Sequence, residues 1–179
     1  MNIKSFLAKP FASYIHSKIK KGAATALADQ ENVLKSLLKG ARITEFGKEH
    51  QLHNVVSYQQ FKEAVPVRDY EALKPWIDKI KEGKHNILWK GKPIYFAKTS
   101  GTTSGVKYIP ISKDSVSNHI NTARNALLCY MAETGNSVFA DGKLIFLSGS
   151  PELERVGGIP TGRLSGIVNH HIPSYLRAN

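Results

Sequence analysis

A short stretch rich in hydroxyl groups and glycine offers the most specific chemistry in the sequence. Residues 98–107 read Lys-Thr-Ser-Gly-Thr-Thr-Ser-Gly-Val-Lys. Glycine lets backbone N–H groups approach an anion closely, serine and threonine donate hydrogen bonds, and lysine offsets negative charge. The combination is typical of a loop that binds phosphate groups. A solvated turn of the same composition is the simpler alternative, which these residues alone leave open.

The spacing within this loop excludes two common sites. A Walker-type P-loop requires a second glycine where Val106 stands, and Ser or Thr where Tyr108 follows Lys107. The nucleophile elbow of α/β-hydrolases requires glycine two residues before the serine, but Thr102 precedes Ser104 at that distance. The loop therefore indicates neither a Walker-type NTPase nor a hydrolase.

The composition is that of a folded, strongly basic chain. Among 179 residues there are 25 Lys and Arg against 14 Asp and Glu, a net charge of +11, and 41% of residues are hydrophobic. These values exclude a disordered or low-complexity chain. The basic residues are mostly dispersed lysines without an arginine cluster among aromatics, which disfavours a nucleic-acid site. The apolar runs are a few residues long, far short of the ~20 that cross a bilayer.

The cysteine and histidine residues support neither a disulfide nor a metal site. Cys129 is the single cysteine, which fits a reducing compartment, and we expect a cytoplasmic protein. The pairs His50/His53 and His170/His171 lack further ligands at the spacing of a metal site. We interpret these histidines as packed or solvated.

The first third of the chain is expected to be helical. Residues 1–21 contain five lysines and no acid, which predicts a basic amphipathic helix packed on the domain, with a membrane surface as the alternative. The apolar residues of this helix are Ile3, Phe6, Leu7, Phe11, Tyr14, Ile15 and Ile19. Asp29 is expected to cap the next helix, Gly40 to end it, and Thr44 to cap a short turn. Its apolar face is expected to hold Val33, Leu34, Leu37 and Leu38.

Two further helices are expected before a sheet begins. The first covers residues 58–64 and stops before Pro66, and the second covers residues 67–80 and closes at Gly83. The second helix should bury one face, made of Tyr70, Leu73, Trp76, Ile77 and Ile80. We interpret Trp76 and Trp89 as core anchors.

Strand-like residues follow at 87–89 and 94–96, on either side of a turn at 90–93. Residues 108–111 predict an edge strand because they contain Pro110. A helix capped by Ser112 or Asp114 should then run to Gly135, with an apolar face of Val116, Ile120, Ala123, Leu127 and Met131. A buried strand is expected at 143–147 and extended structure at 167–168. Few strands beside a long helix predict the front part of a larger domain.

Several of these segments together resemble a known family. The run 61–71, the segments 80–83 and 87–89, and the loop 98–103 are similar, in order and spacing, to the auxin-responsive promoter family of acyl acid amido synthetases. The loop also resembles the phosphate-binding loop of the wider adenylate-forming superfamily, which includes acyl-CoA synthetases and luciferases. The resemblance extends from the leading helices to about Tyr175.

This resemblance implies an α/β fold, namely the N-terminal part of the large domain of the adenylate-forming fold, with a helical first third followed by sheet. Residues 1–179 would be an incomplete adenylating domain without the small C-terminal domain. The implied activity is an ATP- and Mg²⁺-dependent ligase that activates a carboxylic acid as an acyl-adenylate, releasing pyrophosphate. The acyl group then passes to an amine such as an amino acid. The piece alone is expected to be inactive.

The resemblance also assigns residues. Those expected to bind the ATP phosphates are Thr99, Ser100, Gly101, Thr102, Thr103, Ser104, Gly105 and Lys107. Relative to the plant pattern, threonine replaces serine at position 99, and one residue fewer separates Gly105 from Lys107. Candidate substrate contacts are Arg124, Leu127 and Leu128, for which a surface arginine and core leucines are the alternative.

The implied partners are a carboxylic acid and an amine, with no nucleic acid and no membrane. The competing class is a noncatalytic basic module that binds nucleic acid or an anionic membrane surface and uses the loop as an anion site. The sequence specifies neither the acid, the amine nor the oligomeric state.

Overall fold

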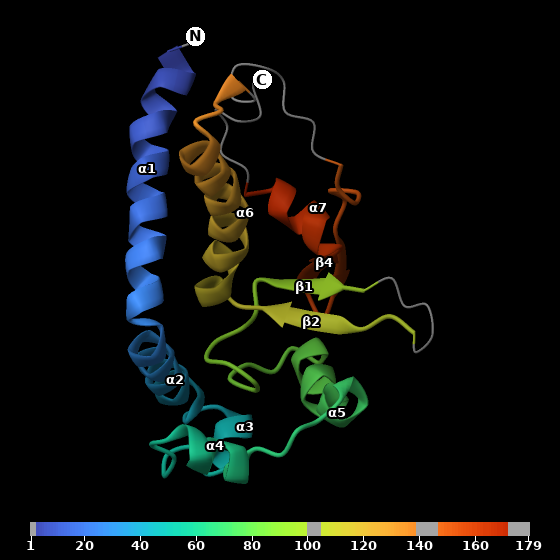
Figure 1. Ribbon diagram of the computed structural model, residues 1–179. Coiled ribbons are helices and arrows are strands. Elements are labelled where there is room, and N and C mark those ends of the chain that lie inside the picture. Colours follow the sequence, from blue (N-terminus) through green and yellow to red (C-terminus); the bar gives the residue numbers. More distant parts are fainter. Residues whose placement is uncertain (1–2, 100–104, 139–146, 172–179) are drawn as a thin grey trace.

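The computed structural model describes residues 3–99, 105–138 and 147–171, which form helices around a small mixed sheet (Figure 1). None of the helices in these ranges is long and apolar enough to span a bilayer. The elements, in order, are α1 (Ile3–Ala24), α2 (Ala26–Ala41), α3 (Glu45–Glu49), α4 (Tyr58–Ala64), α5 (Tyr70–Lys81), β1 (Tyr95–Lys98), β2 (Tyr108–Ile111), α6 (Lys113–Thr134), β3 (Glu154–Val156), β4 (Ile159–Gly162) and α7 (Leu164–Asn169). The helical first part followed by sheet is confirmed.

The sheet has the strand order β2-β1-β4-β3. Strand β1 pairs antiparallel with β2 and parallel with β4, and β3 and β4 form an antiparallel hairpin. The predicted edge strand over residues 108–111 is confirmed as β2. The β3–β4 hairpin was not predicted.

Two helices sandwich the sheet, with α5 on one side and α7 on the other (Figure 1). Alternate residues of β1 therefore enter different cores. Phe96 is fully buried and faces α5, whereas Ala97 packs with Ile167 of α7. The larger core contains Trp76, Ile77, Ile80, Ile87, Phe96 and Ile159. The predicted buried face of α5 and the role of Trp76 as an anchor are thus confirmed.

Helix α1 lies alongside α6 at one side of the molecule (Figure 1). It packs through small residues, with Ala12 fully buried against Leu128 and Met131. The predicted packing of this helix on the domain is confirmed, and Ile15 of the predicted apolar face takes part in it. Other members of that face lie outside the contact, because the close approach of the two helices is made by the alanine face. The large side chains Phe6, Leu7, Phe11 and Tyr14 are 62%, 64%, 46% and 62% exposed.

The helix caps were predicted in most cases. Thr44, Ser112 and Gly135 occupy the expected cap positions, and α4 has the expected bounds. Helix α5 begins at Tyr70, three residues later than predicted, because the Asp69 carboxylate accepts a hydrogen bond from the N–H of Ala72.

Helix α2 differs at both ends from the prediction. Asp29 lies in its first turn, where it accepts a hydrogen bond from the Thr25 hydroxyl at 2.7 Å. Gly40 lies inside α2, where a Cβ would come within 2.5 Å of the Trp89 ring. Gly40 therefore makes room for this half-buried tryptophan instead of ending the helix. Val33 and Leu37 are about half exposed, so only part of the predicted apolar face is covered.

Two predicted extended segments are wrong. Residues 87–89 form bends, although Ile87 is buried in the core, and residues 167–168 belong to α7. Residues 143–146 of the remaining predicted strand lie outside the described residues.

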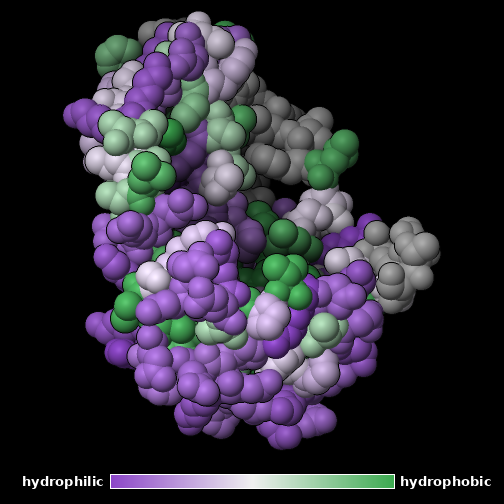
Figure 2. Space-filling view, turned by 60° about the horizontal axis from the view of Figure 1, so that its bottom comes forward, coloured by the Kyte–Doolittle hydropathy of each residue, from purple (hydrophilic) through white to green (hydrophobic). Residues whose placement is uncertain are grey.

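The end of the molecule that carries α3, α4 and α5 is mostly hydrophilic at its surface, with apolar side chains gathered near its middle (Figure 2).

Candidate functional site

The hydroxyl-rich loop connects β1 to β2, and its two ends are hydrogen-bonded to each other. The N–H of Thr99 donates to the carbonyl of Lys107 at 3.0 Å, and the N–H of Lys107 donates to the Thr99 hydroxyl at 3.3 Å. Of the predicted phosphate-binding residues, the structure brings together Thr99 and Lys107 in this way, with Gly105 beside them. Ser100, Gly101, Thr102, Thr103 and Ser104 lie outside the described residues.

Gly105 adopts a conformation that favours glycine. Its φ is +76°, in the left-handed region, and a Cβ at this position would meet no atom within 4 Å. The requirement for glycine therefore comes from the backbone and not from a lack of space. This residue lets the chain turn back into β2.

Cationic side chains surround the base of the loop. The Lys107 ammonium lies 5.5 Å from the centre of the Tyr70 ring, and the Lys81 ammonium lies 4.1 Å from that of Tyr108. On the neighbouring strand, Lys98 forms an ion pair of 2.9 Å with Glu154. The ion pair offsets the charge of Lys98, whereas Lys107 keeps an aromatic neighbour that does not neutralise it. Lys107 is thus the loop lysine best placed to attract an anion.

The hydroxyl of Tyr70 also contacts this region, at the start of α5. It accepts a hydrogen bond of 2.8 Å from the N–H of Tyr108. The helical spacing predicts Tyr70 on a buried helix face and gives no sign of a contact with the loop. Its position just after the Asp69 cap was the only local signal that its orientation is fixed.

The candidate substrate residues are all on α6, where they have different surroundings. Leu128 is buried and packs against Ala12 of α1, as in the alternative of a core leucine. Leu127 is 40% exposed, and the exposed Arg124 guanidinium donates to the Asn125 side chain. A role for these three residues in substrate binding stays a prediction.

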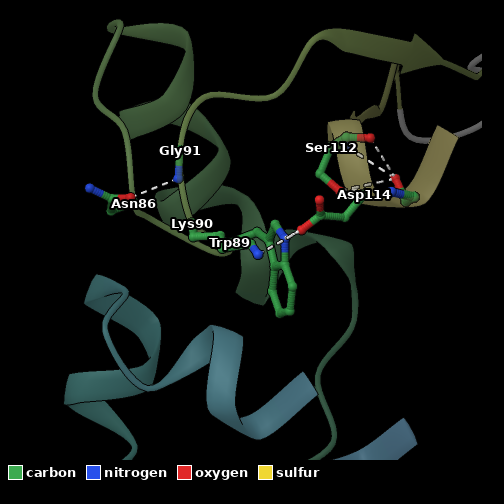
Figure 3. Close-up of polar contacts among 7 residues, drawn as sticks. Asn86, Trp89, Lys90, Gly91, Ser112 and Asp114 are labelled. Atoms are coloured by element: carbon green, nitrogen blue, oxygen red, sulfur yellow. Dashed lines mark hydrogen bonds and ion pairs between the residues drawn. The ribbon is translucent and has the colours of Figure 1, made fainter. Parts of the chain in front are cut away.

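A second feature, which the sequence analysis did not single out, lies at the opposite end of β2 from the loop. A cleft of about 310 Å³ opens between α2, the segment 86–93 and the first turn of α6. The Trp89 indole N–H and the Lys90 ammonium both contact the Asp114 carboxylate at 3.1 Å (Figure 3). The Lys90 ammonium, and then the Trp89 N–H, lower the pKa of Asp114. These contacts fasten the start of α6, and therefore β2, to the preceding segment.

The segment 86–93 is itself closed by local hydrogen bonds. The N–H of Gly91 donates to the Asn86 side chain at 2.7 Å, and both residues have positive φ (Figure 3). The N–H of Asn86 donates in return to the carbonyl of Gly91. This closed turn holds Trp89 and Lys90 toward Asp114.

Two of the four histidines identified in the sequence, His50 and His170, have hydrogen-bond partners in the protein. His50 Nδ1 is bonded to the carbonyl of Phe46 at 2.8 Å, and its Nε2 contacts the Arg68 guanidinium at 2.8 Å. His170 Nε2 is bonded to the carbonyl of Pro151. In the described part of the chain, no three His, Cys, Asp or Glu side chains gather in a way that could hold a metal ion.

Comparison with known proteins gives consistent matches. A model described as the GH3 family N-terminal domain matches residues 15–177. The indole-3-acetic acid-amido synthetase GH3.2 of Arabidopsis thaliana is 32% identical over 138 residues, which cover 73% of this chain and 24% of that protein. The jasmonoyl–L-amino acid synthetase JAR4 of Nicotiana attenuata is 25% identical over 136 residues, covering 74% of this chain and 23% of that protein. The chain thus spans about a quarter of the length of these relatives.

Solved structures show the same fold. The GH3.15 acyl acid amido synthetase superposes with a TM-score of 0.73 at 20% identity, over 84% of this chain and 27% of that structure. A structure of AtGH3.15 in complex with 2,4-DB gives a TM-score of 0.60 at 22% identity. The predicted fold is therefore confirmed as that of the corresponding part, about a quarter, of the GH3.15 structure.

Proposed function

The chain belongs to the GH3 family, and from this membership we propose that it is part of an ATP-dependent ligase that joins a carboxylic acid to an amine. The relatives are named as a jasmonoyl–L-amino acid synthetase and an indole-3-acetic acid-amido synthetase. Because the chain spans about a quarter of their length, the proposal concerns the complete gene product that contains residues 1–179. We further propose a cytoplasmic location, from the single cysteine.

The proposed reaction has two steps. A carboxylate oxygen of the acid attacks the α-phosphorus of ATP, and the bond to the β-phosphate oxygen breaks, so pyrophosphate leaves and an acyl-adenylate forms. The amine nitrogen then attacks the acyl carbon, and AMP leaves with the electron pair of the broken C–O bond. Negative charge gathers on the phosphate oxygens in the first step, where preorganised hydrogen-bond donors stabilise it most.

The observation that carries this proposal is the hydrogen-bonded base of the loop, which holds Thr99 and Lys107 together. Donors held at fixed positions need no reorganisation when charge develops. We propose that the hydroxyl and N–H groups of residues 99–105 bind the ATP phosphates, with Lys107 as the cation. We assign no residues to Mg²⁺, because the described residues contain no group of three or more His, Cys, Asp or Glu side chains that could hold a metal ion. Mg²⁺ therefore stays an expectation.

The test is ATP–pyrophosphate exchange by the complete gene product, measured with a panel of carboxylic acids. We expect exchange only when a suitable acid is present. Ser100→Ala and Thr102→Ala should each reduce the exchange rate about tenfold or more without lowering the melting temperature, because each removes one donor. Ser17→Ala, on the exposed side of α1, is the control. Undiminished exchange in both loop variants would contradict the assignment.

The same preparation distinguishes the competing class of function. A basic module without catalysis would bind nucleic acid or anionic vesicles with an affinity that falls steeply with salt. Its binding would be indifferent to carboxylic acids. The proposed ligase should instead show acid-dependent exchange at any moderate salt concentration.

A further inference from the structure

We propose that Tyr70 is a positioning residue for the phosphate loop, because its hydroxyl fixes the strand end into which the loop runs. This inference rests on the function proposed above and extends it to a residue of α5. Tyr70 and Tyr108 are 38 residues apart in the sequence and are joined by a hydrogen bond of 2.8 Å.

The hydrogen bond occupies the open edge of the sheet. Strand β2 is at the end of the strand order, so among the described residues no further strand pairs with its outer side. The N–H of Thr99 donates to the backbone carbonyl of Lys107, and bonded and non-bonded pairs alternate along an antiparallel ladder. The next pair, Lys98 and Tyr108, is therefore non-bonded, and the N–H of Tyr108 faces outward.

Pro110 occupies the next outward position of the same strand and has no N–H to leave unpaired. The Tyr108 amide is therefore the donor on this edge that needs a partner. Tyr70 supplies this partner at the end of the strand nearest the loop.

The Tyr70 side chain is itself held in place. Its backbone begins α5 directly after Asp69, whose carboxylate accepts the hydrogen bond from Ala72. Its ring packs on the core that contains Trp76 and lies 5.5 Å from the Lys107 ammonium. One side chain thus contacts both residues that lead from the loop into β2.

The hydrogen bond from Tyr108 to Tyr70 matters because Gly105 lies three residues before Tyr108 in the sequence. Gly105 gives the chain conformational freedom two residues before Lys107, and Val106 between them is 47% exposed. Without an anchor on Tyr108, the Lys107 ammonium would sample many positions relative to the donors at Thr99. Catalytic groups that are fixed in advance bind the transition state better than mobile ones.

The experiment compares Tyr70→Phe, which removes the hydroxyl and keeps the ring, with Tyr70→Leu, which removes both. Tyr58→Phe is the matched control, because Tyr58 is exposed on α4 and its ring also lies near a lysine, Lys62. In the complete gene product, we expect Tyr70→Phe to raise the KM for ATP about three- to tenfold, the size of one hydrogen bond. The KM values for acid and amine should be unchanged, and Tyr70→Leu should have the larger effect.

A second measurement reports on the anchor without any substrate. Amide hydrogen exchange of residues 105–108 should be faster in Tyr70→Phe, while exchange within α5 stays as in the wild type. Unchanged exchange at Tyr108 would show that the Tyr70 hydroxyl does not restrain this strand end. An equal rise in every KM would show that Tyr70 only supports the fold. Either result would overturn the inference.

The outcomes separate this inference from the proposed function. A wild-type protein that neither binds ATP nor exchanges pyrophosphate refutes both. A wild-type protein that exchanges pyrophosphate, together with a Tyr70→Phe variant of unchanged KM for ATP, refutes the role of Tyr70 alone.

Discussion

Two adjacent glycines, Gly157 and Gly158, form the turn between β3 and β4, and they are required for different reasons. Both have positive φ, 58° and 75°. A Cβ at Gly157 would lie 2.0 Å from the carbonyl oxygen of Lys81, whereas a Cβ at Gly158 would meet nothing within 4 Å. Gly158 is therefore required by the backbone alone, and Gly157 also by the close approach of the turn to the end of α5.

This difference gives a prediction at matched positions. Gly158→Ala should lower the free energy of unfolding by about 1–2 kcal/mol, the cost of a left-handed residue with a side chain. Gly157→Ala should lower it further, because the backbone of the turn or of α5 must move as well. Urea unfolding of both variants measures the difference. Equal losses of unfolding free energy in the two variants would show that the contact between the turn and α5 does not restrict residue 157.

At the scale of secondary structure, the sequence predicted what short-range contacts determine. The caps Thr44, Ser112 and Gly135 act within three or four residues, so their residue types located helix ends directly. The edge strand followed from Pro110 in the same way. The loop was located by its composition, although its middle residues lie outside the described part of the chain.

Elements that depend on distant partners were not predicted. Strand β4 pairs with β1, about 65 residues earlier in the chain, and Pro160 within β4 conceals its strand character. The Gly-Gly pair between residues 156 and 159 is a hairpin signal that was available in the sequence. The contact of Tyr70 with Tyr108 had no such signal, because no local pattern reveals which donor on a sheet edge lacks a partner.

The junction between the segment 86–93 and α6 gives a pH-dependent prediction at this scale. Lys90 first, and then the Trp89 N–H, lower the pKa of Asp114 from its ordinary value of 3.8. A carboxyl group with a lowered pKa in the folded state stabilises the protein above its unfolded-state pKa, and this contribution is lost as the pH falls through the lowered value. Asp114 also lies in the first turn of α6, where negative charge is favourable.

We therefore expect Asp114→Asn to be less stable than the wild type at pH 7, with the difference shrinking as the pH falls below 3.8. Urea unfolding at a series of pH values between 7 and 3 measures this. Glu31→Gln is the control, since Glu31 is exposed on α2 and lies 3.9 Å from Lys35. A stability difference for Asp114→Asn that is the same at every pH would contradict an electrostatic role.

At the scale of the whole molecule, α1 depends on a single long neighbour. Its side chains Ala8, Ala12 and Ile15 pack on α6, whereas Phe6, Leu7, Phe11 and Tyr14 are exposed. Two polar contacts reinforce the interface, since His16 and Lys20 both contact Glu133, at 2.6 and 3.0 Å. Lys20, followed by His16, lowers the pKa of Glu133. The core at α1 and α6 is separate from the core between α5 and the sheet, so the attachment of α1 and the stability of the loop region should be separable.

This separation can be tested by overfilling the helix interface. Ala12→Leu adds volume where Ala12 is fully buried and should cost about 1–3 kcal/mol in the docking of α1. Because α5 and the sheet have their own core, amide exchange should accelerate in α1 and along the facing part of α6 and stay unchanged in α5. Ser13→Leu, one residue further on the exposed side, is the control and should leave exchange in α1 as in the wild type. Faster exchange throughout α1, α5 and the sheet in Ala12→Leu would instead show that the two parts unfold as one cooperative unit.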